Sequence, residues 1–181
     1  MDKTPMNGQT VYQGRILRLE AGEFLLPHGR RTRMEVVRHP GGVAIAALNE
    51  QGELCLVRQY RPPLEAWIWE LPAGKRDKHE PPLDTARREL EEEAGLRAAR
   101  WDMLGEIYPA PGYSDEVIHL FLARQLSAVP QRLEPDELLE SHWIPLQQAR
   151  GWLYDGTIRD AKSQVGIHLL CSICCAPKPE C

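Results

Sequence analysis

The sequence predicts an α+β fold in which a mixed β-sheet lies between helices, an α/β/α sandwich. Three observations predict it. Strand-like segments fill the first third of the chain, an amphipathic helix interrupts the strand pattern near the middle, and two helical segments come last. The 181 residues are also enough to bury a core of ordinary size.

An N-terminal region, residues 1–40, is expected to form antiparallel strands ahead of the sandwich, which is expected to span residues 41–181. Segments 14–27 and 31–39 carry β-branched and long apolar residues with partial alternation. A Pro-His-Gly-Arg turn joins the two segments.

The sheet of the sandwich is expected to begin with a hairpin made by residues 41–49 and 53–61, which a glycine-containing turn separates. The first arm is apolar almost throughout, which indicates burial on both faces. The remaining strands are expected at 65–74, before a Pro/Gly break, and then at 100–110, 116–126 and 141–146.

The helix near the middle has clear start and stop signals. Prolines at 81–82 suit a first helical turn, because their missing N–H groups are not needed there. Leu83, Ala86 and Leu90 form an apolar stripe, and Gly95 fits a left-handed cap at the end. The last two helices are expected at 146–154 and 160–175. The second of these has apolar residues at i, i+4 spacing: Ala161, Val165, Leu169 and Ile173.

Composition excludes several classes of function. The net charge of −4 argues against a general nucleic-acid binder. The first residues lack the apolar stretch of a secretory signal, and the longest apolar run is far too short to span a bilayer. Five cysteines, four of them in the last eleven residues, make a poor disulfide framework, and their spacing fits no standard zinc knuckle. We therefore expect a cytoplasmic protein without nucleic-acid or membrane partners.

One face of the middle helix concentrates carboxylates. Glu89 and Glu93 stand one turn apart, Glu92 flanks them, and Arg88 is placed to pair with Glu92 at i, i+4. Glu91 points elsewhere and is expected to be solvated. Like charges at these spacings repel by tenths of a kcal/mol, so the face is either ordinary solvated surface or a hard-oxygen site for Mg²⁺ or Mn²⁺. Composition alone leaves both interpretations open.

The spacing of the residues around this face resembles the signature of the Nudix hydrolase family. All nine specified positions match: Gly74, Glu80, Arg88, Glu89, Leu90, Glu92, Glu93, Gly95 and Leu96. The resemblance implies the Nudix fold and a strand-loop-helix metal site that hydrolyses a nucleoside diphosphate linked to another moiety. In that site Gly74 would let the chain turn tightly, and Glu80 would orient the helix carboxylates. The implied metal ligands for Mg²⁺, or alternatively Mn²⁺, are the Ala73 carbonyl, Glu89, Glu92 and Glu93.

Flanking residues resemble the ADP-ribose pyrophosphatase branch of the family. An Arg-Gln-Tyr-Arg strand occupies 58–61, Glu-Leu-Pro-Ala-Gly occupies 70–74, and Pro111 stands fifteen residues after Leu96. This resemblance implies Mg²⁺-dependent hydrolysis of ADP-ribose to AMP and ribose 5-phosphate. Two alternatives stay open: a nucleotide-sugar pyrophosphatase, acting for example on GDP-mannose, and a non-catalytic Nudix domain that senses ADP-ribose or a nucleotide.

The same resemblance implies the substrate-binding residues Arg58, Arg61, Glu70, Pro111 and Gly112. Arg61 is expected to hold the diphosphate, since guanidinium pairs with phosphate bidentately. Pro111 and Gly112 are expected to shape a loop over the terminal ribose. As ordinary residues, the arginines would be surface charges and Pro111-Gly112 only a turn. Trp67 and Trp69 alternate onto one face, where core or subunit packing is favoured over adenine stacking.

A catalytic base is expected in the acidic loop before the last strand. The resemblance favours Glu137, with Glu134 and Glu92 as alternatives, because a mobile loop can bring a carboxylate to the attacking water. It also implies a homodimer in which residues 11–38 contribute to the partner's substrate pocket.

Overall fold

The computed structural model describes residues 7–77, 79–135 and 137–174. These divide into two compact units, one made of residues 7–41 and 108–117 and one made of the remaining described residues. The first unit contains β1 (Asn7–Gln13), β2 (Arg18–Leu25) and β3 (Arg31–Arg38). The second contains β4 (Gly42–Leu48), β5 (Glu53–Arg61), the 3-10 helix η1 (Pro62–Leu64), β6 (Ala66–Glu70), β7 (Ala73–Lys75), α1 (Pro82–Ala94), β8 (Leu96–Ile107), β9 (Ile118–Ala128), β10 (Leu139–Pro145), α2 (Leu146–Tyr154) and α3 (Ala161–Cys174).

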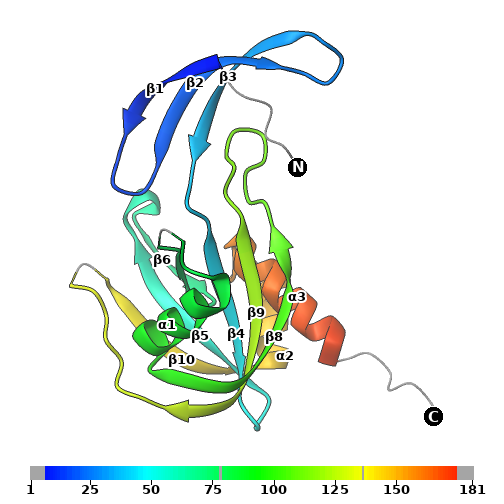
Figure 1. Ribbon diagram of the computed structural model, residues 1–181. Helices are drawn as coiled ribbons and strands as arrows, with labels where there is room; N and C mark the ends of the chain where they lie inside the picture. The colour runs from blue at the N-terminus through cyan, green and yellow to red at the C-terminus, as the bar shows by residue number, and fades with distance from the viewer. Residues whose placement is uncertain (1–6, 78, 136, 175–181) are drawn as a thin grey trace. The chain divides into compact units, whose positions relative to one another are not determined.

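In the first unit, β1, β2 and β3 form a three-stranded antiparallel sheet in that order (Figure 1). The two strands expected from the sequence are β2 and β3. The strand β1 was not expected, because its residues are largely polar and lack alternation. Residues 108–117 are tied to β3 by hydrogen bonds from Val37 N to Tyr113 O (2.8 Å) and from Asp115 N to Val37 O (3.2 Å).

The second unit contains the mixed sheet between helices that the fold class predicted, whereas residues 108–117, which were expected to belong to the sandwich, fall in the first unit. The sheet of the second unit has the order β10-β5-β4-β9-β8, and β6 pairs with β5 while β7 pairs with β4. All of these pairs are antiparallel except β4 with β9, so the sheet is mixed, as predicted. The segment expected as one strand at 65–74 is two strands. Pro72 lies between them, where its carbonyl accepts a hydrogen bond from Ile45 N at 2.8 Å.

Two apolar layers hold the sandwich together. One lies under α1 on one face of the sheet, and the other lies under α2 and α3 on the opposite face (Figure 1). On one face of the sheet α1 packs through Ala86 and Leu90 against alternate residues of β4, such as Ile45. On the other face Ile167 and Leu170 of α3 pack in one cluster with residues of β4, β5, β9 and α2. The β4 strand is therefore buried on both faces, as its apolar sequence predicted.

The apolar spacing that predicts α3 does not mark its buried face. Val165 is 37% and Ile173 is 56% exposed, whereas Ile167, Leu170 and Cys171 are buried. A Cβ added at Gly166 would lie 2.6 Å from Leu71 Cδ1, so a glycine is what lets α3 approach the sheet on this side. Cys175 and Cys181 lie outside the described residues. Within the described part of the chain, no helix has the length and apolar character needed to cross a membrane.

Candidate active site

The helix α1 forms as the sequence predicted and presents its polar face to the site. Pro81 is extended and its carbonyl accepts hydrogen bonds from Asp84 N (3.0 Å) and Thr85 N (3.1 Å) in the first turn. At the other end Gly95 adopts φ 63°, the left-handed conformation that favours glycine, and its N–H bonds to Glu91 O. With the apolar stripe against the sheet, the glutamates of the helix lie on the remaining faces.

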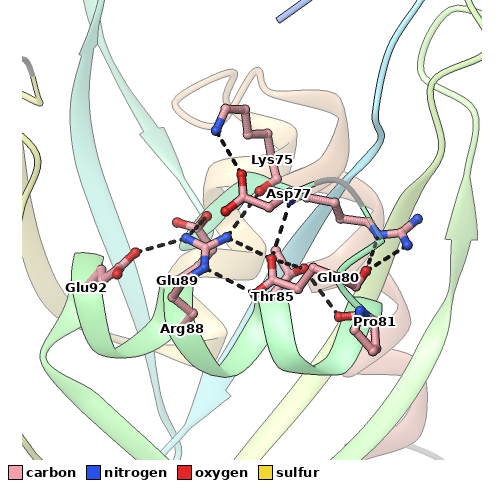
Figure 2. Close-up of polar contacts among 9 residues, drawn as sticks. Lys75, Asp77, Glu80, Pro81, Thr85, Arg88, Glu89 and Glu92 are labelled. Carbon is pink, nitrogen blue, oxygen red and sulfur yellow. Dashed lines mark hydrogen bonds and ion pairs between the residues drawn. The ribbon is translucent and has the colours of Figure 1, made fainter.

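Arg88 gathers the carboxylates of this region (Figure 2). Its Nη1 donates to Glu89 Oε1 at 2.8 Å and to Glu92 Oε2 at 3.0 Å, which confirms the predicted pairing with Glu92. Its Nη2 donates to Glu80 Oε2 at 3.1 Å. Glu80 also accepts a hydrogen bond from Thr85 Oγ1 at 2.8 Å. Glu80 is therefore linked to Glu89 and Glu92 through Arg88.

Glu89 fills the space that Gly74 leaves open. A Cβ at Gly74 would stand 1.9 Å from Glu89 Cδ and 2.1 Å from its Oε1, closer than any side chain tolerates. The sequence interpretation gave Gly74 a tight turn. In the structure Gly74 lies within β7, and its φ is not positive. Its role is therefore to let a carboxylate approach the backbone closely.

Glu93 is buried against the strand that precedes the helix. Its side chain accepts a hydrogen bond from Ala73 N at 2.8 Å, and the residue is 3% exposed. Burial raises the pKa of Glu93 to about 8, with Ala73 opposing the rise and Glu89 and Glu137 adding to it. Burial likewise raises the pKa of Glu89 to about 7, against the influence of Arg88. In both carboxyl groups the effect of burial exceeds that of the neighbouring arginine, Arg88 for Glu89 and Arg61 for Glu93, and a divalent cation would offset it further.

The residues fit a hard divalent cation in chemistry but are not yet arranged around one. Within residues 7–77, 79–135 and 137–174, no group of three or more His, Cys, Asp or Glu side chains is placed to hold a metal ion. The guanidinium of Arg88 bridges two of the carboxylates, Glu89 and Glu92. The oxygen donors, the burial of Glu89 and Glu93 and the close approach of the Glu89 carboxylate to Gly74 all suit Mg²⁺. Metal binding would require Glu89 and Glu92 to exchange the guanidinium for the ion.

Glu91 lies apart from this cluster, as expected, but it is not simply solvated. Its two carboxylate oxygens accept hydrogen bonds from Arg97 Nε (2.8 Å) and Nη2 (3.1 Å). Arg97 is the second residue of β8, so the pair joins the helix to the strand that follows it.

Arg61 and Glu70 form a bidentate pair across β5 and β6. Arg61 Nε donates to Glu70 Oε1 at 2.7 Å and Nη2 donates to Oε2 at 2.8 Å. Glu70 is 1% exposed, whereas the Arg61 side chain is 37% exposed. Arg61 also lies close enough to Glu93 for its charge to lower the pKa of that carboxyl. The structure therefore brings two of the predicted substrate residues together beside the carboxylate face.

Arg58 lies on the opposite face of β5 from Arg61, since side chains alternate along a strand. Its guanidinium stands 5.6 Å from the centroid of the Trp67 ring, and Trp67 is 42% exposed. Trp69 instead packs on Trp152 and His142, which agrees with the packing role favoured for it. Within this chain Arg58 is thus not part of the Arg61–Glu70 group, and its contact with substrate stays a prediction.

Three residues join the site that the sequence did not indicate: Asp160, just before α3, and Lys162 and Ser163 in its first turn. Lys162 Nζ donates to Glu70 Oε2 at 2.5 Å and contacts Asp160 Oδ2 at 3.0 Å. Ser163 Oγ accepts a hydrogen bond from Leu71 N at 2.7 Å. An Asp before a predicted helix is a recognisable cap. However, Lys162 and Glu70 are 92 residues apart, and no local pattern signals that contact.

The acidic loop between β9 and β10 carries the proposed base. Glu134 N donates to Glu137 Oε2 at 2.8 Å, and Glu137 N donates to Glu134 O at 3.0 Å, which closes a tight turn. The charge of Glu137 contributes to raising the pKa of Glu89 and of Glu93. Glu137 is therefore near the carboxylates of α1.

The start of this loop is fastened to the end of α1. Gln131 Nε2 donates to Glu93 O at 2.5 Å, and Arg132 N donates to Glu92 O at 3.1 Å. These bonds satisfy helix carbonyls that have no partner within the helix.

Pro111 and Gly112 belong to the first unit. Both are exposed and lie in a turn, where Tyr113 N donates to Ala110 O at 3.2 Å. Their role beside a ribose stays a prediction.

Known proteins resemble this chain in sequence and in fold. The model of the family described as the NUDIX domain matches residues 38–163. The chain is 37% identical over 164 residues to an ADP-ribose pyrophosphatase of Bacillus subtilis (strain 168), which covers 90% of this chain and 89% of that protein. It is also 37% identical over 164 residues to a methanol dehydrogenase activator of Bacillus methanolicus, with the same coverage.

Among solved structures, a crystal structure of an ADP compounds hydrolase superposes with a TM-score of 0.78 at 24% sequence identity. The match covers 94% of this chain and 93% of that one. At this identity the likeness concerns the fold.

Proposed function

Because the chain belongs to the Nudix family of hydrolases, we propose that it hydrolyses the diphosphate of ADP-ribose to AMP and ribose 5-phosphate in an Mg²⁺-dependent reaction. The observation that carries the proposal is the Arg61–Glu70 pair beside the buried carboxylates of α1. A diphosphate needs both an anchoring cation and a site for a metal. This arrangement supplies a guanidinium and the acidic ligands side by side.

The metal ligands of the proposal are Glu89, Glu92, Glu93 and the Ala73 carbonyl, with Mg²⁺ preferred and Mn²⁺ as the alternative. An ion bound by these residues would supply positive charge to offset that of the diphosphate and would make a water more acidic. Arg61 anchors the diphosphate. Its bonds to Glu70 use Nε and Nη2, so the other edge of the guanidinium can face phosphate oxygens.

Glu137 is the proposed general base, with Glu134 and Glu92 next in line. A water oxygen attacks one phosphorus of the diphosphate, the bridging P–O bond breaks, and the proton of the water passes to the Glu137 carboxylate. The nearness of Glu137 to Glu89 and Glu93 supports this role. In the structure its Oε2 accepts a hydrogen bond from Glu134 N.

A substrate panel tests the proposal. The protein is incubated with Mg²⁺ and ADP-ribose, GDP-mannose, NADH, diadenosine polyphosphates or FAD, and the products are separated by chromatography. We expect ADP-ribose to react fastest and to yield AMP and ribose 5-phosphate. Faster turnover of GDP-mannose would favour the nucleotide-sugar alternative. Binding of ADP-ribose without turnover would favour a sensing domain.

We also propose a homodimer in which residues 11–38 contribute to the partner's substrate pocket. The support is a set of large apolar side chains in the first unit, each more than one third exposed: Val11, Tyr12, Ile16, Leu17 and Leu25. Light scattering at micromolar concentration should give about twice the monomer mass of 20.6 kDa. A monomer mass at that concentration would exclude the dimer.

A further inference from the structure

We infer that Lys162 is a positioning residue for Arg61. From the first turn of α3, the ammonium group holds Glu70 and thereby fixes the guanidinium that binds the diphosphate. The inference rests on the proposed function, because it concerns how that function's anchoring cation is held in place.

The geometry makes Glu70 a shared partner of two cations. Oε1 accepts a hydrogen bond from Arg61 Nε, and Oε2 accepts one from Arg61 Nη2 and one from Lys162 Nζ, at 2.7, 2.8 and 2.5 Å. Glu70 is 1% exposed, so water supplies none of its charge compensation. Burial alone would raise the pKa of Glu70, but Arg61 and Lys162 together lower it. The carboxylate is therefore ionised and held from two sides.

Lys162 itself is poorly placed to contact a substrate. Its side chain is 14% exposed and its ammonium lies between two carboxylates, Glu70 and Asp160. Asp160 is fixed in turn, since its Oδ2 accepts hydrogen bonds from Ser163 N (2.9 Å) and Ser163 Oγ (2.6 Å). The ammonium group thus has a defined position and acts through Glu70.

A second cation on Glu70 changes what Arg61 can offer. Without Lys162, Arg61 would face two carboxylates, Glu70 and Asp160, and the group would carry a net negative charge. With Lys162, the charges of the four side chains balance, and Arg61 keeps more of its attraction for an anionic diphosphate. Because Arg61 is the more exposed partner, loss of Lys162 should weaken substrate binding more than the chemical step.

The test compares Lys162→Met and Lys162→Gln, which remove the charge, with Lys162→Arg, which keeps it. Steady-state kinetics on the best substrate of the panel should show KM raised about tenfold and kcat within about threefold for both neutral variants, which corresponds to roughly 1.4 kcal/mol of binding. Lys162→Arg should restore most of the loss. Arg150→Met, which removes an exposed cation on α2, is the matched control and should behave as the wild type.

A double-mutant comparison separates positioning from general support of the fold. In an Arg61→Ala background, Lys162→Met should change KM by less than about twofold, because coupled residues are not additive. Full additivity, or an unchanged KM in both neutral variants, would overturn the inference.

Failure of the proposed function would look different. If the wild type prefers another diphosphate, the same variants are compared on that substrate, and only the substrate assignment fails. If it turns over nothing, the dissociation constant of ADP-ribose measured by calorimetry takes the place of KM. If ADP-ribose does not bind either, both proposals fall.

Discussion

Two ionic clusters of the second unit differ in how they are built. The first gathers Glu80, Glu89 and Glu92 on the single guanidinium of Arg88, with Glu93 close by. Its residues come from one continuous stretch of β7, loop and α1. The second pairs the cations Arg61 and Lys162 with the carboxylates Glu70 and Asp160, and it joins β5, β6 and the start of α3.

The two clusters also differ in the balance of carboxylates and cations. In the first, carboxylates outnumber the cation, and two of them have pKa values raised to about 7 and about 8. In the second, charges balance and the pKa of Glu70 is lowered. A cluster with excess negative charge can accept a metal ion, whereas the balanced second cluster holds Arg61 in a fixed position, with its side chain 37% exposed. The proposed function accordingly gives the first cluster the metal and the second the anchoring of the diphosphate.

The largest effect should follow from breaking the first cluster. Glu93→Gln and Glu89→Gln should each lower turnover of ADP-ribose by on the order of 10² or more, through loss of a charge that holds the metal over the diphosphate. Turnover is measured at saturating Mg²⁺. Glu91→Gln is the matched control from the same helix, since Glu91 pairs with Arg97, and it should stay near wild type. Wild-type turnover in both site variants would refute the metal assignment.

Replacing the proposed general base should lower turnover nearly as much. Glu137→Gln is expected to lower kcat by about 10²-fold while KM for ADP-ribose stays within a few-fold, because the loop carboxylate acts on the water and not on the substrate. Glu134→Gln, in the same turn, should do less. Steady-state kinetics on both variants decides between them. A Glu137→Gln enzyme that keeps most of its kcat would move the base to Glu134 or Glu92.

A smaller effect is expected from Gly74→Ala, which displaces a carboxylate without removing it. The new Cβ would meet the flexible end of Glu89, so the side chain should move and turnover should fall about tenfold. Thermal unfolding should change little, since the backbone of β7 needs no positive φ at this position. A large fall in Tm with unchanged turnover of the folded fraction would contradict this explanation.

Breaking the second cluster should affect stability. Glu70→Gln leaves Arg61 and Lys162 without their shared charge, which should cost about 2–3 kcal/mol of unfolding free energy, less than a fully buried pair because Arg61 is partly exposed. For a chain of this size that is a fall in Tm of roughly 5–10 °C. Glu140→Gln, an exposed position in β10, is the control.

The effect of Glu70→Gln on the free energy of unfolding should also depend on pH. Because the pKa of Glu70 is lowered in the folded state, its contribution is present above its ordinary value of 4.5 and is lost as pH falls below it. The difference in unfolding free energy between wild type and Glu70→Gln should therefore shrink on acidification. Urea unfolding at pH 7 and at about pH 3.5 measures it, and a constant difference would exclude this role for the Glu70 charge.

Sequence patterns predicted the features that depend on residues close together in the chain. The prolines at 81–82, the stripe through Ala86 and Leu90 and the cap at Gly95 defined α1, and the spacing of its glutamates indicated the carboxylate face. The apolar run of β4 predicted burial on both faces. Each of these depends on residues within a few turns of one another, where periodicity and capping chemistry have direct physical meaning.

What the sequence did not predict depends on distant contacts. No spacing rule connects Lys162 with Glu70, and the largely polar strand β1 is recognised by its pairing with β2, not by its own sequence pattern. The apolar stripe of α3 was misleading for a related reason. Gly166 and Ser163 lie on the face that fits the sheet, so closeness of approach, rather than side-chain hydrophobicity, selects that face.

The parallel pairing of β4 with β9, the one parallel strand pair in the sheet that the described residues form, has a consequence for how the protein folds. The strands β8 and β9 form an antiparallel pair, whereas β4 has to find β9 across much of the chain. Closing so long a loop is entropically costly and slows folding relative to local contacts. Since α1 packs on β4 together with Phe121 and Ala123 of β9, the helix has no complete docking surface until that pair has formed. During refolding from denaturant, recovery of hydrolysis should therefore lag behind the early gain of helical and hairpin signal.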